Sequence, residues 1–402
     1  MSLQLPGRSC AVRLTLHFGV TPSLFCAEVI TGDPANNVTD AIFSKLGAKL
    51  HTRRDHPICI LKDAIHQYFD SRFGAGVFAQ LDDLHPLVST EQNFDQVLVP
   101  PDHVSRSPND TYYVNAHTVL RCHTSAHQVD TLRSGKRAFL ITGDVYRRDA
   151  IDATHYPVFH QMEGVRVFAP ADWAASGQDG TAFAAAELKS TLEGLARHLF
   201  GAETEVRWID AYFPFTEPSF EMEIFFNGAW MEVLGCGVMQ QRILDGALGG
   251  NPGEHRAWAF GLGLERLAMV LFGIPDIRLF WTSDERFTRQ FKAGTFKPGG
   301  AGTKFSSFSK YPPCLKDVSF WMPPGDQFTE NNLCEVVRSV AGDLVEEVKL
   351  MDKFTSPKTG KTSGCYRIVY RSMERSLTDE EINALQTEVR SRMVSQLSVE
   401  LR

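Results

Sequence analysis

Two arginines and two polar side chains stand at opposite ends of one candidate β-hairpin, residues 143–164. Arg147 and Arg148 leave its first strand, while Gln161 and Glu163 alternate along the returning strand and so share a face. The planar guanidinium of arginine can bind two oxygens of one phosphate or carboxylate. The spacing therefore predicts that this hairpin binds an anion of one of these kinds.

A second candidate segment, AFGLGLERLAM at 259–269, reads as a glycine-rich turn that leads into a helix. The glycines would let the backbone approach a nucleotide closely, and Arg266 could hold phosphate oxygens or stack on a base. The segment lacks the G-x-G-x-x-G spacing and the preceding unit of dinucleotide-binding folds, so we expect no dinucleotide.

A third segment, RCHTSAHQ at 121–128, sets His123, Ser125 and Gln128 close together after a candidate strand. Taken alone, it is better explained as the capped start of a helix than as a site. A role in binding is indicated only if this segment lies beside the two other segments in the fold.

The elements around these segments indicate an α+β domain. A helix with one apolar stripe begins at Pro57 and ends before Gly74. From about 98 to 263, strand-like runs alternate with polar loops, and helical stretches near 184–199 and 262–270 interrupt them. Strands joined by hairpins imply a mainly antiparallel sheet flanked by helices.

A Gly-, Lys- and Ser-rich stretch separates this domain from a second regular one. The second reads strand, helix, strand, strand, helix, strand, which is the βαββαβ order of a ferredoxin-like sandwich. Thr378 and Glu381 form a capping box before its second helix. We therefore predict an N-terminal segment at 1–35, the α+β domain at 36–293, a linker at 294–310 and the ferredoxin-like domain at 311–402.

Composition limits the class of protein. The 402 residues exceed one domain of about 100–200 residues, and 43% hydrophobic and 22% charged residues are typical of globular proteins. The net charge of -7 argues against nonspecific coating of nucleic acid, although a local basic face is compatible with it. The eight cysteines show no C-x-x-C pair and no zinc-like spacing, which is typical of free thiols in a reducing compartment, and no metal ligand is predicted.

The N-terminus and the apolar runs bear on location. Residues 1–27 lack Asp and Glu, carry Arg8 and Arg13, and include several Ser and Thr. This composition is typical of an organellar transit peptide, with a disordered tail as the alternative, and it does not separate mitochondrion from plastid. No run approaches the roughly 18–20 apolar residues of a membrane span, so we expect no membrane association.

The ordered motifs resemble one family. The Y-R-x-D hairpin and the G-L-G-x-E-R helix resemble motifs 2 and 3 of class II aminoacyl-tRNA synthetases. HTS at 123–125, HYPVFHQMEG, YFPFTEPSFE and WMEVLGCG are similar to signatures of the phenylalanine-specific branch, and the resemblance runs from about Asn36 to Arg402. A ferredoxin-like domain fused behind the catalytic domain resembles the single-chain organellar members, whereas bacterial relatives carry it on a separate β subunit.

The resemblance implies an enzyme that activates L-phenylalanine with ATP and Mg²⁺ and transfers it to tRNA(Phe). It further implies a monomer without an obligate protein partner, located in the mitochondrial matrix, the chloroplast stroma or both. Arg147 would hold the α-phosphate and the amino-acid carboxylate, and Arg266 would share the catalytic role by stabilising charge. Phe159 and Arg266 would sandwich adenine, and Ala259 would limit side-chain size at the floor of the pocket.

The remaining roles follow from the same resemblance. The ATP-binding set that it implies is Arg147, Asp149, His155, Phe159 and Arg266. Asp149 stands where many members have Glu. The phenylalanine-binding set is His123, Ser125, Gln161, Glu163, Phe213, Phe215 and Ala259. Glu217 and Glu232 could contact a metal ion, but a structural role is equally compatible with their positions.

A basic stretch in the second domain suggests the RNA contact. Between Lys349 and Arg375 there are seven basic and two acidic residues, and Arg367 and Arg371 fall on one face of a candidate strand. Such a face is usually only solvated, but the resemblance to an anticodon-binding domain implies that these two arginines bind tRNA.

Two rival functions are open at this point. One is an amide-forming ligase on the same fold that makes an acyl-adenylate but never binds tRNA, against which the ferredoxin-like domain argues. The other is a catalytically silent RNA-binding relative, against which the intact Arg147, Phe159, Glu163 and Arg266 argue.

Overall fold

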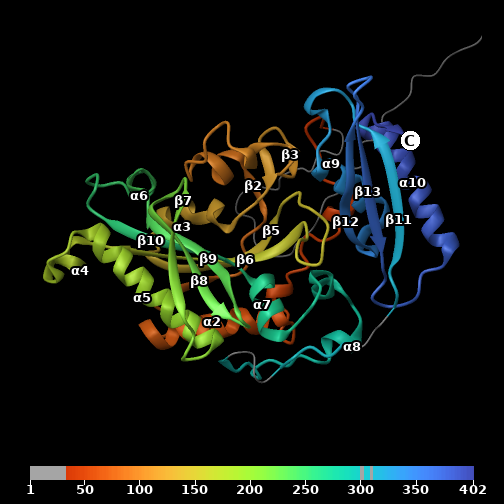
Figure 1. Cartoon of the computed structure of the whole chain (residues 1–402). Helices are drawn as coiled ribbons and strands as arrows, with labels where there is room; N and C mark the ends of the chain where they lie inside the picture. Colours follow the sequence, from red (N-terminus) through yellow and green to blue (C-terminus); the bar gives the residue numbers. More distant parts are fainter. Residues whose placement is uncertain (1–32, 299–302, 308–310) are drawn as a thin grey trace, which may run out of the picture.

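A seven-stranded sheet forms the centre of the first part of the chain. The computed structural model describes residues 33–298, 303–307 and 311–402. The strands of this sheet are β1 (Ala79–Leu81), β5 (Ala138–Tyr146), β6 (Val158–Phe168), β7 (Val206–Phe213), β8 (Thr216–Phe226), β9 (Ala229–Met239) and β10 (Arg256–Gly263). They lie in the order β1-β5-β6-β10-β9-β8-β7, and only the β1–β5 pair is parallel. The expected antiparallel sheet is confirmed (Figure 1).

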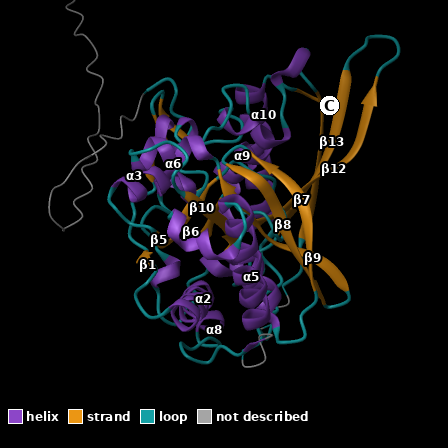
Figure 2. Ribbon diagram, turned by 90° about the vertical axis from the view of Figure 1, so that its left-hand side faces the viewer, coloured by secondary structure: helices purple, strands orange, loops and turns teal. Residues whose placement is uncertain are grey.

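Helices cover both faces of this sheet (Figures 1 and 2). One face carries α2 (Pro57–Phe73) and α5 (Gly180–Phe200), and the other carries α3 (Gln128–Arg133) and α6 (Gln241–Leu248). Successive side chains of a strand point to opposite faces. Leu140 of β5 accordingly packs in the core beneath α2 and α5, while Phe139 and Ile141 pack in the core beneath α3 and α6.

The first long helix follows its sequence signals. Pro57 occupies the first turn of α2, and the imidazole of His56 accepts a hydrogen bond from the Ile58 N–H at 3.3 Å. The helix ends at Gly74, whose φ of 99° favours glycine. The predicted helix is therefore confirmed at both ends.

The glycine-rich segment before α7 (Leu264–Phe272) is a strand, so our expectation of a turn was wrong. Gly261 pairs with Glu163 and Gly263 with Gln161, because β10 lies between β6 and β9. Pairing on both sides offsets the weak strand preference of glycine. Helix α7 begins directly after Gly263, which places Arg266 in its first turn.

Smaller elements complete this part of the chain. A three-stranded sheet in the order β2-β4-β3 closes one side of the large sheet. Its strands are β2 (Leu87–Ser89), β3 (Tyr113–Asn115) and β4 (Thr118–Leu120). Short helices here include α1 (Asp40–Phe43), α4 (Pro170–Trp173), α8 (Glu285–Thr288) and the 3-10 turn at Thr124–His127.

The second part of the chain is the expected ferredoxin-like sandwich. Its elements are β11 (Cys314–Trp321), α9 (Glu330–Ala341), β12 (Val345–Thr355), β13 (Thr362–Tyr370), α10 (Asp379–Leu397) and β14 (Glu400–Leu401). The sheet order is β12-β13-β11-β14, and all neighbours are antiparallel. The capping box of Thr378 and Glu381 at the start of α10 is also confirmed.

The loop between β5 and β6 joins the two parts. Ile151 of this loop is 6% exposed and belongs to the hydrophobic core of the ferredoxin-like part, and its carbonyl accepts a hydrogen bond from the Val348 N–H at 3.0 Å. The Arg338 side chain donates to the carbonyl of Asp149 at 2.9 Å. Tyr156 donates to Asp343 at 2.5 Å. The loop between β5 and β6, which begins at Arg147, is thus held in place by the second part of the chain.

Three expectations concern the ends and the linker. The candidate transit segment at 1–27 lies outside the described residues. Within the described ranges, no helix is both long enough and apolar enough to cross a bilayer. The described part of the 294–310 stretch packs on the first part, since the Phe305 N–H donates to the Phe272 carbonyl at 2.7 Å and the Lys304 ammonium to the Leu271 carbonyl at 2.8 Å.

Candidate active site

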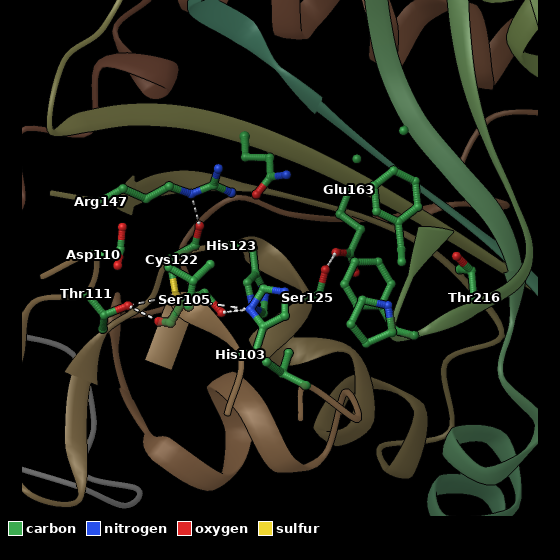
Figure 3. Close-up of a pocket in the computed structure, with 18 of the residues that line it drawn as sticks. His103, Ser105, Asp110, Thr111, Cys122, His123, Ser125, Arg147, Glu163 and Thr216 are labelled. Atoms are coloured by element: carbon green, nitrogen blue, oxygen red, sulfur yellow. Dashed lines mark hydrogen bonds between the residues drawn. The ribbon is translucent and has the colours of Figure 1, made fainter. Parts of the chain in front are cut away.

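A cavity of about 580 Å³ lies along the large sheet and receives side chains from all three candidate segments. Strands β6, β9 and β10, the β7–β8 connection and the 121–128 segment contribute to its wall, and Figure 3 shows part of the lining. Nine of the twelve residues in the predicted ATP- and phenylalanine-binding sets line it: His123, Ser125, Arg147, Asp149, Gln161, Glu163, Phe213, Phe215 and Ala259.

Glu163 is a buried carboxylate on the wall of this cavity. Its side chain is 2% exposed, and the hydroxyl of Ser125 donates a hydrogen bond to its Oε2 atom. Its Oε1 atom has no hydrogen-bond partner among the described residues. Burial raises the pKa of Glu163 to about 7, and the hydrogen-bonding side chains of Ser125 and Gln128 oppose that shift only in part. The site therefore has an unused acceptor that a cation could fill.

His123 and Gln161 extend the polar wall. The Thr124 N–H donates to Gln161 Oε1 at 3.2 Å, which leaves the Gln161 amide nitrogen available. Burial, and to a smaller extent the positive charge of Arg147, lower the pKa of His123 to about 3. His123 is therefore neutral near pH 7, and its Nδ1 atom has no hydrogen-bond partner in the described ranges.

An aromatic slot lies beside this polar wall. The rings of Phe213 and Phe215 stack with centroids 5.9 Å apart and an interplanar angle of 7°. Gly235 makes room for the Phe213 ring, because a Cβ atom there would lie 2.6 Å from Cζ of Phe213. Ala259, only 4% exposed, contributes a single methyl group to the lining. The slot fits a flat apolar ring.

Arg147 stands in the part of the cavity away from the slot. Its guanidinium lies 5.2 Å from the centroid of the Phe159 ring, and its Nε donates to the Cys122 carbonyl at 2.8 Å. These contacts orient the side chain and leave its two terminal nitrogens without an acceptor among the described residues. Figure 3 shows Glu163 between Arg147 and Thr216, the residue that follows the aromatic slot. A free guanidinium in this position suits a phosphate.

Arg266 and Phe159 lie next to the cavity and are not part of its lining. The Arg266 side chain is 58% exposed, and its Nη1 atom lies 3.5 Å from Oε2 of Glu232, which does line the cavity. Each of them contacts a residue that lines the cavity. Phe159 contacts Arg147, and Arg266 contacts Glu232. A ligand that extends beyond the wall could meet both.

His155 is exposed and pairs with a residue of its own loop. It does not line the cavity, and its Nδ1 atom lies 2.6 Å from Oδ2 of Asp152. Asp149 does line the cavity, and its Oδ1 atom accepts a hydrogen bond from the Ala150 N–H at 2.8 Å.

The two arginines predicted to bind RNA have different surroundings. Arg367 lies on β13 and forms a two-pronged ion pair with Asp317 of β11, at 2.8 Å for both contacts. Arg371 lies one residue beyond β13, where it pairs with Glu346 at 3.2 Å and its carbonyl accepts from Arg278 at 3.3 Å. Arg371 therefore faces the contact with the first part of the chain.

Sequence reasoning missed residues that reach the site from elsewhere. Asn331, at the start of α9, lines the cavity and donates weakly to the Arg148 carbonyl at 3.3 Å. No local pattern could have revealed it, since it comes from the other part of the chain. Tyr212 was inside a recognised motif, yet only the structure shows it at the rim of the cavity.

The carboxylates of the site do not form a metal site by themselves. In residues 33–298, 303–307 and 311–402, no three His, Cys, Asp or Glu side chains cluster as a metal site. Glu232 lines the cavity, while Glu217 is exposed and does not. A cation at this site would need ligands from a bound substrate.

Comparison with known proteins places this geometry in a family. Residues 43–291 match the family model described as tRNA synthetases class II core domain (F), and residues 309–402 match the ferredoxin-fold anticodon binding domain. The chain is 65% identical to the chloroplastic/mitochondrial phenylalanine--tRNA ligase of Arabidopsis thaliana, over 92% of this chain and 83% of that protein. It is 47% identical to the mitochondrial phenylalanine--tRNA ligase of Mus musculus, over 92% and 86%.

A bacterial relative matches a smaller share of the chain. The phenylalanine--tRNA ligase alpha subunit of Acinetobacter baumannii strain AYE is 39% identical over 59% of this chain and 67% of its own length. The mouse and Arabidopsis proteins each cover 92% of the chain and therefore match both of its parts. The chain therefore belongs to the chloroplastic and mitochondrial phenylalanine--tRNA ligases, which are class II aminoacyl-tRNA synthetases with a ferredoxin-fold anticodon-binding domain.

Proposed function

We propose that this chain attaches phenylalanine to tRNA(Phe) at the expense of ATP, through a phenylalanyl-adenylate. One observation carries the proposal: a single cavity contains an aromatic slot, a buried carboxylate with a free oxygen, and a guanidinium with free donors. These three features complement the ring, the ammonium group and the phosphate of that adenylate. The names of the relatives point to the same substrates.

Phenylalanine would bind with its ring in the slot and its ammonium group on the polar wall. The free Oε1 atom of Glu163 would accept from the ammonium group. The Gln161 Oε1 atom, which can accept a second hydrogen bond besides that from Thr124, and the neutral His123 would complete its hydrogen bonds. Phe213 and Phe215 would meet the substrate ring, a contact worth about 0.5–1.5 kcal/mol per aromatic pair beyond area burial. This arrangement recognises both ends of a free amino acid.

ATP would occupy the side of the cavity that Arg147 lines. Arg147 would bind the α-phosphate and the amino-acid carboxylate, and Phe159 and Arg266 would stack on the two faces of adenine. Asp149 lies close enough to the cavity to contact the nucleotide. His155 would need to leave Asp152 before it could reach the outer phosphates.

Mg²⁺ would enter with ATP as part of the substrate. Magnesium usually keeps several waters and binds phosphate oxygens with one or two carboxylates. Glu232 fits such a role, because it lines the cavity and its contact with Arg266 is 3.5 Å long. The metal would supply charge neutralisation at the phosphates.

The reaction needs no nucleophile from the protein. The carboxylate oxygen of phenylalanine attacks the α-phosphorus, the bond to the bridging oxygen breaks, and pyrophosphate leaves with the electron pair. The chain contributes by aligning the two reactants and by placing positive charge where negative charge develops. Arg147 and Arg266 are the residues that we assign to this role.

The tRNA would contact the outer face of the ferredoxin-like sheet. Arg367 lies on that face, and Lys349 stands opposite it on β12. Four residues before Arg367 on the same strand, Ser363 lies between Phe354 and Trp321. Aromatic side chains on a four-stranded sheet are a common platform for unpaired RNA bases. The β12–β13 hairpin projects from the molecule where an RNA could reach it (Figure 2).

Arg371 is a weaker candidate for tRNA binding than Arg367. Both arginines pair with an acidic residue, Arg367 with Asp317 and Arg371 with Glu346, but Arg371 lies at the contact between the two parts of the chain. We therefore base the RNA-binding proposal on Arg367 and the row of aromatic residues. We also infer that the chain acts as a monomer in an organelle, supported by the names of its single-chain relatives and by the composition of residues 1–27.

Phenylalanine-dependent exchange of pyrophosphate into ATP, compared with tyrosine and followed by charging of tRNA(Phe), tests the proposal. We expect exchange with phenylalanine far above that with tyrosine, and both reactions should be lost in Arg147→Ala. The surface variant Arg133→Ala should keep both. Exchange without charging would instead indicate an adenylate-forming ligase, and RNA binding without exchange would indicate a silent relative.

A further inference from the structure

Tyr212 is a large aromatic side chain that is left uncovered at the rim of the active-site cavity. It is 74% exposed and yet counts among the residues that line the cavity. Within the described part of the chain, no group binds its hydroxyl and no ring packs on it. The two phenylalanines of the same motif, Phe213 and Phe215, are in contrast partly covered and stacked on each other. The fold thus presents this ring to the mouth of the cavity.

The position of Tyr212 results from an irregularity in the sheet. Ala211 pairs with Ser219 of β8, but Phe213 pairs with Thr216, so Tyr212 has no partner in the register. Such irregularities re-aim side chains and are frequent beside active sites. Here Phe213 turns onto Gly235 inside the slot, while Tyr212 turns outward.

The uncovered ring suits the flat face of a nucleic-acid base. Asp210 precedes it on the same strand and Glu217 follows on the facing strand, and both are exposed. These two carboxylates would repel a phosphate group placed there. A neutral base can stack on tyrosine without a charged partner, and base–aromatic stacking is the usual means of holding unpaired nucleotides.

The proposed function supplies one base that must come to this rim. After adenylate formation, the phenylalanyl group fills the slot and AMP fills the nucleotide side. The ribose hydroxyl oxygen of the terminal tRNA nucleotide then attacks the carbonyl carbon. The bond from that carbon to the phosphate oxygen breaks, AMP leaves with the electron pair, and the hydroxyl proton is taken up by the departing phosphate. The terminal base itself has to stay outside both filled parts.

We propose that Tyr212 stacks on the 3′-terminal base of the tRNA and so positions its ribose hydroxyl for the transfer step. The inference rests on the proposed function. It assigns Tyr212 to the second half-reaction alone, because amino-acid activation leaves the rim of the cavity empty. Tyr212 is thus a substrate-binding residue for tRNA and not for phenylalanine.

The test separates the two half-reactions in Tyr212→Ala. We expect phenylalanine-dependent pyrophosphate exchange within about twofold of the unaltered chain, and a kcat/KM for tRNA charging lower by about tenfold or more, as the loss of one stacked base implies. Tyr212→Phe keeps the ring and should charge tRNA almost normally. Phe225→Ala removes an aromatic side chain that is 43% exposed but outside the cavity, and should leave both reactions unchanged.

A second measurement uses a tRNA whose last nucleotide lacks its base. The unaltered chain should charge this tRNA poorly, and Tyr212→Ala should lose little further, because both changes remove the same contact. Equal loss of exchange and charging in Tyr212→Ala would overturn the inference and assign the ring to the amino-acid site. Unchanged charging would overturn it as well. Failure of exchange in the unaltered chain would instead refute the proposed function.

Discussion

Glu265 binds His160 through both of its carboxylate oxygens. Its Oε2 atom accepts from the His160 backbone N–H at 2.7 Å, and its Oε1 atom contacts the imidazole Nδ1 at 2.6 Å. Both side chains are buried, and the imidazole stacks on Trp281 with centroids 6.0 Å apart. Because Glu265 starts α7 and His160 lies on β6, this contact fixes the helix of Arg266 against the strand of Glu163.

Glu265→Gln should destabilise the protein by about 2–4 kcal/mol, because one amide can accept only one of the two hydrogen bonds and turns its NH₂ group toward a donor. Urea denaturation measures this change. The KM for ATP should rise more than the KM for phenylalanine, since α7 carries Arg266. Glu285→Gln, which affects an exposed ion pair with Arg289, should change stability by less than about 0.5 kcal/mol.

The pH dependence of phenylalanine binding should report Glu163. Its pKa is raised to about 7, so the carboxylate that the ammonium group needs forms only as the pH passes neutrality. The KM for phenylalanine should therefore fall about tenfold between pH 6 and pH 8. Glu163→Gln should bind weakly at every pH and lose this dependence. An identical profile in that variant would assign the effect to another group.

The same carboxyl should affect the stability of the protein without substrate. Because the pKa of Glu163 is higher in the folded than in the unfolded chain, the folded chain binds the proton more tightly. Its contribution to stability is therefore complete below about pH 4.5, the unfolded value, and is lost as the pH rises toward 7. Glutamine does not titrate, so the stability of Glu163→Gln relative to that of the unaltered chain should increase as the pH rises from 5 to 8. Thermal unfolding at a series of pH values measures this difference.

Ala259 should set the size of amino acid that the slot accepts. Ala259→Val adds bulk to a buried wall and should lower phenylalanine-dependent exchange by tenfold to a few hundredfold, since one or two methylenes in an apolar pocket are worth about 1–3 kcal/mol each. Ala259→Gly should admit a para-halogenated phenylalanine that the unaltered chain rejects. Competition between the two amino acids in the exchange assay measures this. Unchanged selectivity in both variants would remove Ala259 from the slot.

Arg338→Met tests whether the second part of the chain supports the ATP site. Arg338 is buried, pairs with Glu335, and donates to the Asp149 carbonyl, while Glu335 also accepts from Tyr112 at 2.8 Å. Loss of the guanidinium leaves Glu335 buried without its cation, so we expect a loss of about 3 kcal/mol in unfolding free energy. The KM for ATP should rise severalfold while that for phenylalanine changes little.

The control for this variant is Arg197→Met, which removes an exposed arginine that pairs with Glu193 at 3.5 Å within one helix. It should leave stability and both KM values nearly unchanged. Equal effects on the two KM values in Arg338→Met would indicate general loosening of the fold. In that case the ferredoxin-like part would not support the ATP site specifically.

Local signals in the sequence were sufficient to predict several elements. A proline in the first turn and a glycine after the last turn bound α2, and Thr378 with Glu381 marks the start of α10. Alternation in the returning strand of the hairpin placed Gln161 and Glu163 on one face, and both line the cavity. These features depend on residues a few positions apart, which is why sequence alone reveals them.

Features that depend on distant residues were not predictable in this way. The strand that ends at Gly263 exists because β6 and β9 pair with it. The glycines of its local sequence usually indicate a turn, so the strand could not be predicted from that sequence. Arg371 looked like part of a basic strand face, but its partner Glu346 and its neighbour Arg278 come from elsewhere in the fold. Asn331 reaches the cavity only because the two parts of the chain dock.

The insertion of Ile151 into the core of the ferredoxin-like part limits how the protein can be divided. A truncated chain that stops before β11 would expose Ile151 to water and would leave the hydroxyls of Tyr112 and Tyr156 without their acceptors. A chimaera that borrows this unit from a relative would have to reproduce a cavity for an isoleucine side chain. The two parts of the chain are therefore not interchangeable modules, and the boundary between them is a poor place to cut.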